Sequence, residues 1–141
     1  MKKFSSAFTM IELVFVIVVL GILAGIAVPR LAATREDAQI AKIRGDVAAV
    51  RSGISLRRAE NLMKGDVAWP ELNVTKNDKT LFANVLQQPI YEGSDKNGWK
   101  KNDDGSFTAR VGGQSTTFNY NRNTGVFDCD HSKALCKKLA E

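Results

Sequence analysis

The 141-residue sequence predicts an α+β protein in which one long N-terminal helix packs, through its second half, on a small C-terminal antiparallel sheet. Three observations predict this fold. An apolar run occupies residues 8–28, an amphipathic helical period follows over residues 30–64, and strand-like alternation begins only near residue 106. A helix first and strands last is the order of elements typical of an α+β domain.

The apolar run is long enough to cross a membrane. Phe8 to Val28 spans about 21 residues, or roughly 31 Å as a helix, and a bilayer core is about 30 Å thick. Lys2 and Lys3 precede the run and would hold the short end on the cytoplasmic side. We therefore expect a transmembrane helix over residues 8–29, with the bulk of the chain exported.

Glu12 is the one carboxylate inside this run, and no other charge occurs from Leu13 to Val28. A carboxylate within a membrane span costs roughly 2.5–3.5 kcal/mol on insertion scales and usually has a partner. No Lys, Arg or His lies within helical reach on its C-terminal side. The simplest partner is a backbone amine created by cutting the chain just upstream, and the alternative is a tolerated charge near a helix end.

The N-terminus resembles the class III leader of type IV pilins and type II secretion pseudopilins. The family pattern is a short basic leader, a small residue, then Phe-Thr-Leu-Ile-Glu-Leu and an apolar helix. Here Phe8 to Leu13 matches this pattern with Met10 in place of Leu, and Ala7 stands where the family usually has Gly. The segment from Gly21 to Pro29 is also similar to the family. The resemblance implies a pilin-like version of the predicted fold.

The resemblance also implies a maturation step. A prepilin peptidase would remove the leader, residues 1–7, by cutting between Ala7 and Phe8, and would N-methylate Phe8. The new ammonium would pair with Glu12 of a neighbouring subunit as the helix joins a filament. Removing one partner of a buried ion pair typically costs about 3–5 kcal/mol, so such a pair would fix the register between subunits.

Three further residues of the helix bear on assembly. Gly21 and Gly25 form a Gly-x-x-x-Gly motif, which permits close helix approach. In the family, the stretch that matches Gly21 to Pro29 can lose helicity in the filament, and a simple kink at Pro29 is the alternative.

The implied function is structural. The chain would be a pilus or pseudopilus subunit, most similar to a type II secretion pseudopilin, that polymerises with itself and minor pilins. The partners would be prepilin peptidase, an inner-membrane assembly platform and membrane lipid, with residues 30–141 as a bacterial periplasmic domain. The alternative is a type IV pilus or competence (DNA-uptake) pilin that contacts DNA.

An ordinary secretory signal peptide is a rival interpretation of the N-terminus. Cleavage after the small residues of Gly25-Ile26-Ala27 would release a soluble domain beginning at Val28. Glu12 interrupts the apolar region that such a signal needs, and Pro29 stands just after the cut, so both residues argue against it.

The amphipathic stretch continues the same helix to about Leu62 or Lys64, where Gly65 stops it. Apolar residues recur at intervals of three and four, and charges fill the other faces. The apolar positions are Ile40, Ile43, Val47, Val50 and Ile54. A half-buried face of this kind implies that the sheet packs on it.

Residues 65–105 predict a long, irregular connection. Trp69-Pro70 marks a loop, and Asp78 is placed to cap a short helix over Thr80–Gln87 that ends before Pro89. The side chains of that helix expected to point inward are Phe82, Val85 and Leu86. Family members vary here, so the connection is expected to carry partner-specific surface.

Strands are predicted over residues 106–129. Ser106–Val111 alternates and ends at Gly112-Gly113, which is a two-residue hairpin signal. Gln114–Asn121 returns, Asn121–Gly125 turns again, and Val126–Cys129 is a third strand. The result is an antiparallel meander followed by a tail, residues 130–141, in which a helical turn is possible.

Cys129 and Cys136 are expected to form a disulfide, because an exported domain folds in an oxidising compartment. Such a bridge would tie the tail to the last strand. Two free thiols are one alternative. A metal site built from both cysteines and His131 is another, but it lacks a fourth ligand.

Two loop segments carry clustered oxygens, Asp95-Lys96-Asn97-Gly98 and Asp103-Asp104-Gly105. Major pseudopilins are known as a group for calcium in C-terminal loops, so calcium is a possible ligand. Calcium needs six or more oxygens, however, and these clusters show no EF-hand spacing and more often make turns. No cofactor is otherwise expected.

The net charge and the lack of catalytic motifs argue against two other functions, nucleic-acid binding and enzymatic activity. The formal net charge is +5, and removal of the leader takes away two lysines, so charge alone does not indicate nucleic acid. DNA contact would rest on the basic doublets Arg57-Arg58, Lys100-Lys101 and Lys137-Lys138, which are usually solvated surface. His131 is the one His, and no catalytic constellation is present, so an enzyme is not expected.

Overall fold

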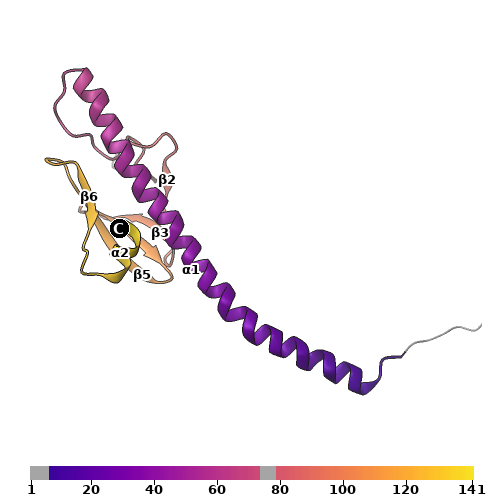
Figure 1. Ribbon diagram of the computed structural model, residues 1–141. Coiled ribbons are helices and arrows are strands. Elements are labelled where there is room, and N and C mark those ends of the chain that lie inside the picture. Colours follow the sequence, from indigo (N-terminus) through magenta and orange to yellow (C-terminus); the bar gives the residue numbers. More distant parts are fainter. Residues whose placement is uncertain (1–6, 74–78) are drawn as a thin grey trace, which may run out of the picture. The chain divides into compact units, whose positions relative to one another are not determined.

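The computed structural model describes residues 7–73 and 79–141 (Figure 1). The chain forms two compact units, the first ending at Arg35 and the second running from Glu36 to Glu141, and each is described by itself. The elements in chain order are α1 (Met10–Met63), β1 (Thr80–Leu81), β2 (Ile90–Tyr91), β3 (Gly98–Lys101), β4 (Phe107–Val111), β5 (Gln114–Asn121), β6 (Val126–Cys129) and α2 (Ala134–Ala140).

The first unit contains the apolar part of α1. Among the described residues, α1 is the helix long and apolar enough to cross a membrane, and none of its apolar window is buried within the protein. The helix runs without a break through Pro29, which was expected to weaken or kink it. An exposed apolar surface of this kind is typical of a helix that lipid or other helices surround.

The second unit is built on a four-stranded antiparallel sheet in the order β3-β4-β5-β6, and β1 and β2 form a separate two-stranded ribbon. In β4 the alternate residues Phe107, Ala109 and Val111 are buried, which is the period of a strand with one face on a core. Together these elements give the pilin-like α+β arrangement that the sequence predicts.

The predicted turns and tail are confirmed. Gly112 and Gly113 both have positive φ, +57° and +84°, as a two-residue hairpin loop between β4 and β5 requires. Gly65 follows the end of α1 with φ +84°, which is the usual helix stop. The tail forms α2, whose Leu135 and Leu139 are buried.

One buried stripe of α1 joins the sheet in a single core. Ile43, Val47, Val50 and Ile54 are almost fully buried, as their spacing predicts. The centre of the core is a cluster of five aromatic rings with centroids 4.5–6.3 Å apart. These rings belong to Phe82, Trp99, Phe107, Phe118 and Phe127.

The expected helix over Thr80–Gln87 is wrong. Residues 80–81 form β1, and Phe82 has φ +60°, a left-handed conformation that no α-helix contains. Its N–H donates to Oδ1 of Asn73 (2.8 Å) instead of to a helical carbonyl. Asp78, the expected cap, lies outside the described residues. Phe82 and Val85 are nevertheless buried, and Leu86 packs against the core, as predicted.

The connection over residues 65–105 is also more structured than predicted, because it contains β1, β2 and β3. Trp99 on β3 is buried in the core, and its Nε1–H donates to Oδ2 of Asp46 on α1 (3.0 Å). Burial raises the pKa of Asp46, although the Trp99 hydrogen bond and the nearby Lys42 oppose the increase. The sheet thus has a fourth strand, next to α1, that the predicted meander lacks.

Candidate assembly site at the start of α1

The first turn of α1 is closed by a reciprocal pair of hydrogen bonds. The Thr9 N–H donates to Oε2 of Glu12 (3.1 Å), and the Glu12 N–H donates to Oγ1 of Thr9 (3.3 Å). This is a capping box, in which the residue before the helix and the third residue inside it satisfy each other's free N–H groups. Glu12 also lies in the first turn, where a negative charge is favoured by the helix dipole.

The capping box gives Glu12 a local role that was not predicted from the sequence. The sequence contains the Thr-x-x-Glu spacing at Thr9 and Glu12, from which the capping box could have been predicted. The cap uses one carboxylate oxygen of Glu12, so the second oxygen and the negative charge are available to another group. The two roles, a cap within the chain and a charge for a partner, are therefore compatible.

The residues around the predicted cut are accessible. Ala7 and Phe8 precede the first helical residue, Met10, and the Phe8 side chain is 86% exposed. Residues 7–9 lie outside regular structure. The structure thus leaves the predicted cleavage point accessible.

The two glycines of the apolar segment leave open space on the helix. A side-chain carbon added at Gly21 or Gly25 would meet nothing within 4 Å. Both residues lie on the exposed surface of α1, where their small size lets another helix approach closely. Whether the segment from Gly21 to Pro29 unwinds in a filament stays a prediction.

In the second unit, α1 also carries small residues on its exposed side, as it does at Gly21 and Gly25 in the first unit. Small residues recur at alternating intervals of three and four, and every one of them is exposed. We call this set the small-residue stripe, and it consists of Ala38, Ala41, Gly45, Ala48, Ser52, Ser55 and Ala59. The buried apolar period of the same helix was predicted from the sequence, whereas this second period was not.

The predicted disulfide is present between Cys129 on β6 and Cys136 on α2, with 5.8 Å between the two Cα atoms. The bond leaves neither sulfur as a thiolate ligand, which removes the alternative metal site with His131. Chain entropy gives a loop of this size about 2.5 kcal/mol of stabilisation.

Arg51 of α1 holds the same region together. Its guanidinium donates to the carbonyl oxygens of Phe127 (3.0 Å) and Ala140 (3.2 Å), and to Oδ1 of Asp128 (3.2 Å). A planar fork of five N–H donors suits such a set of acceptors. One side chain thereby connects the long helix to β6 and to the end of α2.

His131 completes this C-terminal cluster. Its ring nitrogens lie 2.9 Å from the carboxylate of Asp128 and 3.2 Å from that of Glu141. Hydrogen bonds to Asp128 and then to Glu141 raise the pKa of His131 above its ordinary value of 6.5. Burial acts to raise the pKa of Asp128, but bonds from His131 and the Cys129 N–H outweigh it and lower the pKa below 3.8.

These shifts predict a pH-dependent stability. The His131 contribution is complete below pH 6.5 and is lost as pH rises through the raised pKa, whereas the Asp128 contribution is lost as pH falls through the lowered one. We expect the melting temperature to fall between about pH 5.5 and about pH 8.5, and to fall less in His131→Gln. Thermal unfolding of the full chain in detergent, followed by tryptophan fluorescence, checks this. An equal decrease in both proteins would contradict it.

The loops considered for calcium use many of their oxygens within the protein. The carboxylate of Asp95 lies 3.8 Å from the guanidinium of Arg110, and Oδ1 of Asn97 accepts a backbone hydrogen bond from the β4–β5 turn. Oδ1 of Asp104 accepts the Ser106 N–H (2.9 Å). These contacts are those of turn-forming residues, and calcium binding here stays a prediction.

The basic doublets lie on three different elements. In Arg57-Arg58 of α1, the first guanidinium is 2.9 Å from Glu60 and the second lies over the ring of Trp69. Lys100-Lys101 lies on β3, and Lys137-Lys138 lies in the last turn of α2, where cations complement the helix dipole. DNA contact through these doublets stays a prediction.

Comparison with known proteins bears on the N-terminus. Residues 2–28 match the family model of the prokaryotic N-terminal methylation motif. This chain carries that motif. The match includes Ala7, Phe8 and Glu12, and the motif together with the apolar start of α1 fits a protein anchored in the inner membrane.

Among curated proteins, three relatives carry the same name, type II secretion system core protein G. The Pseudomonas aeruginosa protein is 32% identical over 60 residues, which is 43% of this chain and 42% of the relative. The Aeromonas hydrophila protein is 37% identical over 60 residues, again 43% and 42% of the two chains. The Dickeya chrysanthemi protein is 34% identical over 61 residues, 43% and 40%.

The chain thus spans about two fifths of the length of the curated relatives that it matches. No solved structure matches it significantly. The similarity therefore supports the resemblance to pseudopilins over 43% of this chain.

Proposed function

We propose that the chain is a structural, non-enzymatic subunit of a type II secretion-type pseudopilus. After cleavage between Ala7 and Phe8 and N-methylation of Phe8, subunits would polymerise from the inner membrane with their second units in the periplasm. The observation that carries this proposal is the methylation motif over residues 2–28, which includes the exposed apolar start of α1 and the one carboxylate of that apolar segment, Glu12. The names of the three relatives support the secretion variant.

The partners follow from this function. Prepilin peptidase and an inner-membrane assembly platform would act on the first unit, membrane lipid would surround its helix before assembly, and other copies or minor pilins would surround it afterwards. Both environments would remove the large apolar surface of α1 from water. Glu12 would then pair with the new ammonium of a neighbouring copy.

Intact mass spectrometry of the protein from its native membrane tests the proposal. A mass that begins at Phe8 and carries one extra methyl group is the expected result. A chain that begins at Val28, or one that retains Met1, would overturn it, because neither species provides the methylated amine. Cysteine crosslinking between copies then tests whether the processed chain assembles.

The small-residue stripe supports assembly along the second half of α1. A helix face of small side chains permits close approach of another helix, and heptad spacing keeps such a face aligned with its partner. A side-chain carbon at Gly45, in the middle of the stripe, would meet nothing within 4 Å in the single chain. The face is therefore unoccupied by the chain's own described residues.

This feature predicts the outcome of a bulky substitution on the stripe. We expect Ala48→Trp to block assembly while changing the free energy of unfolding by no more than about 0.5 kcal/mol, because Ala48 is exposed. The neighbouring exposed residue Ala49 lies off the stripe, so Ala49→Trp is the matched control and should assemble. Equal crosslinking yields from both variants would argue against the stripe as a packing face.

A further inference from the structure

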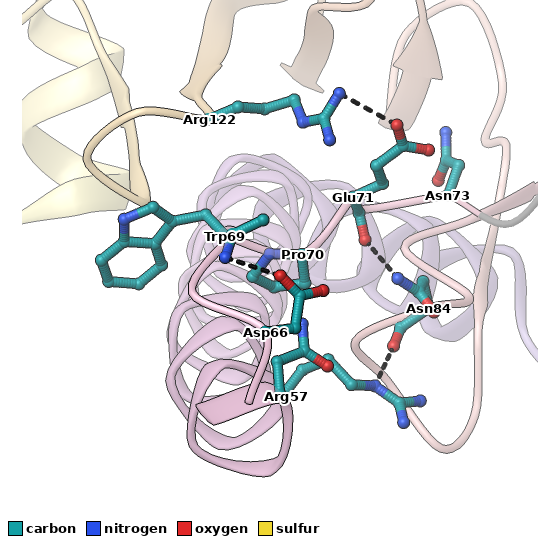
Figure 2. Close-up of a pocket in the computed structure, with 10 residues that line it drawn as sticks. Arg57, Asp66, Trp69, Pro70, Glu71, Asn73, Asn84 and Arg122 are labelled. Atoms are coloured by element: carbon teal, nitrogen blue, oxygen red, sulfur yellow. Dashed lines mark hydrogen bonds and ion pairs between the residues drawn. The ribbon is translucent and has the colours of Figure 1, made fainter. Parts of the chain in front are cut away.

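A hollow lies at the C-terminal end of α1, against the segment after the helix and the β5–β6 turn. It encloses about 480 Å³ and is lined by Arg58, Val67, Ala68, Trp69, Arg122 and Asn123. An adjoining hollow, drawn in Figure 2, shares Ala68, Trp69 and Arg122 with it. We call the first one the Arg58–Trp69 hollow. All six of these residues belong to the second unit.

The aromatic wall of this hollow is held in place from several sides. The guanidinium of Arg58 lies 4.7 Å from the ring centroid of Trp69, in a cation–π contact. The backbone of Gly125, with φ +73°, lies so close to the ring that a side-chain carbon there would overlap it. Tyr120 donates its hydroxyl to the carbonyl of the next residue, Pro70 (2.8 Å). The hollow is therefore preformed, which reduces the entropy lost on binding.

Arg58 is the arginine at this end of the molecule whose charge is not compensated. Arg57 pairs with Glu60 (2.9 Å), and Arg122 pairs with Glu71 (3.0 Å, Figure 2). In the described part of the chain, Arg58 has no acidic partner, and its Nη1 is shielded from solvent without a hydrogen bond. An unpaired buried donor costs roughly 1–3 kcal/mol, and more when it is charged.

Because Arg58 has no acidic partner among the described residues and is partly shielded from water, it favours an anionic ligand. Part of the hydration of the cation is already lost, so an incoming carboxylate meets a smaller desolvation cost than at an ordinary surface arginine. Arg122 is 60% exposed and forms one ion pair through Nη1, which leaves further N–H donors for a second contact. None of the six residues that line the hollow is acidic.

We propose that the Arg58–Trp69 hollow binds a carboxylate side chain of an acidic peptide segment from a partner protein. Arg58 and Arg122 would bind the carboxylate, and the side-chain amide of Asn123 would supply a further donor. Val67, which is 74% exposed at the rim, offers apolar contact to a residue next to the acid. The segment that fits is an acidic residue flanked by an aliphatic one.

A nucleic acid fits this hollow less well. Single strands bind basic grooves by stacking bases on free aromatic faces. The Trp69 ring already contacts the Arg58 guanidinium and the Gly125 backbone, and both contacts use ring surface that a base would need. The inference does not rest on filament assembly, because it uses contacts of the second unit alone.

Fluorescence anisotropy on the full-length protein in detergent tests the proposal. The probes are a labelled, end-blocked Gly-Leu-Glu-Leu-Gly peptide and its Gln counterpart. The Glu peptide should bind better than the Gln peptide, and Arg122→Gln should weaken its binding roughly tenfold or more. Arg58→Gln should do the same, and Arg122, an exposed residue, provides the test if Arg58→Gln does not fold.

Lys138→Gln is the matched control, since it removes an exposed positive charge from α2, outside the hollow. Binding should stay within about twofold of the original protein. Equal binding of the Glu and Gln peptides, or an equal loss in Lys138→Gln, would overturn the proposal. Binding of a single-stranded oligonucleotide that requires Arg58 and Arg122, without binding of the peptide, would replace it by a nucleic-acid site.

Discussion

Replacing Glu12 with Gln is expected to abolish filament assembly while leaving leader cleavage and α1 intact. The reason is that Gln keeps the hydrogen bond but not the charge. A capping box accepts Gln as well as Glu at this position, so the bond from the Thr9 N–H is retained. An ammonium from a neighbouring copy would instead lose its counter-ion in an apolar environment.

The expected magnitude is large. Leaving one partner of a buried ion pair uncompensated costs about 3–5 kcal/mol, which corresponds to a loss of more than a hundredfold in the equilibrium constant for each contact. Glu12→Ala should also assemble poorly, but it removes the cap and the charge together and cannot separate them. Crosslinking between copies, together with the intact mass of each variant, measures assembly and processing in the same samples.

Thr9→Ala is the matched control, because it weakens the helix cap and keeps the charge of Glu12. It removes the Oγ1 acceptor of the Glu12 N–H and keeps the carboxylate, at an expected cost of about 1 kcal/mol to the start of α1. We expect this variant to assemble. If Thr9→Ala fails while Glu12→Gln assembles, Glu12 acts as a helix cap and the ion pair is wrong.

The sequence predicted those parts of the fold in which local pattern and tertiary contact agree. The period of Ile43, Val47 and Val50 placed the buried face of α1, and Gly112-Gly113 placed the hairpin, because the turn chemistry is local. The disulfide followed from the compartment that the leader implies. Each of these features is specified by residues close together in the chain or by a single covalent bond.

The wrong predictions concern segments whose secondary structure is determined by contacts with residues far away in the sequence. Leu81 and Phe82 fit a helical period with Val85, but both are fully buried as neighbours, which Phe82 achieves through its left-handed φ. β3 offers one apolar residue, Trp99, among lysines, so its strand character appears only on pairing with β4. Local propensity could not reveal either arrangement.

The functional residues also fall into two groups, those that a local motif predicts and those that only the tertiary structure brings together. The assembly role of Glu12 and the cut before Phe8 could be predicted because both residues lie within one local motif, and both stay predictions. The sequence did not predict the acceptors of Arg51, since Phe127 and Asp128 lie 76 and 77 residues further along the chain. Nor did it predict the Arg58–Trp69 hollow, whose walls come from separate parts of the chain.

The second large effect is expected at the glycines in the second half of α1, where the same substitution should act in opposite directions. Glycine inside a helix is normally destabilising by roughly 0.5–1 kcal/mol relative to alanine. At Gly45 an added methyl group meets nothing within 4 Å, so Gly45→Ala should stabilise the second unit by about that amount.

At Gly53 the same methyl group would overlap the carbonyl oxygen of Val85, and the next contacts are also with Val85. That oxygen belongs to backbone and cannot rotate away, so the segment carrying Phe82 and Val85 would have to shift from the core. Overpacking of this kind costs about 1–3 kcal/mol, which exceeds the gain in helix propensity. We expect Gly53→Ala to lower the melting temperature and Gly45→Ala to raise it, measured by tryptophan fluorescence, to which the buried Trp99 contributes. An increase in both variants would mean that α1 does not pack on Val85 as described.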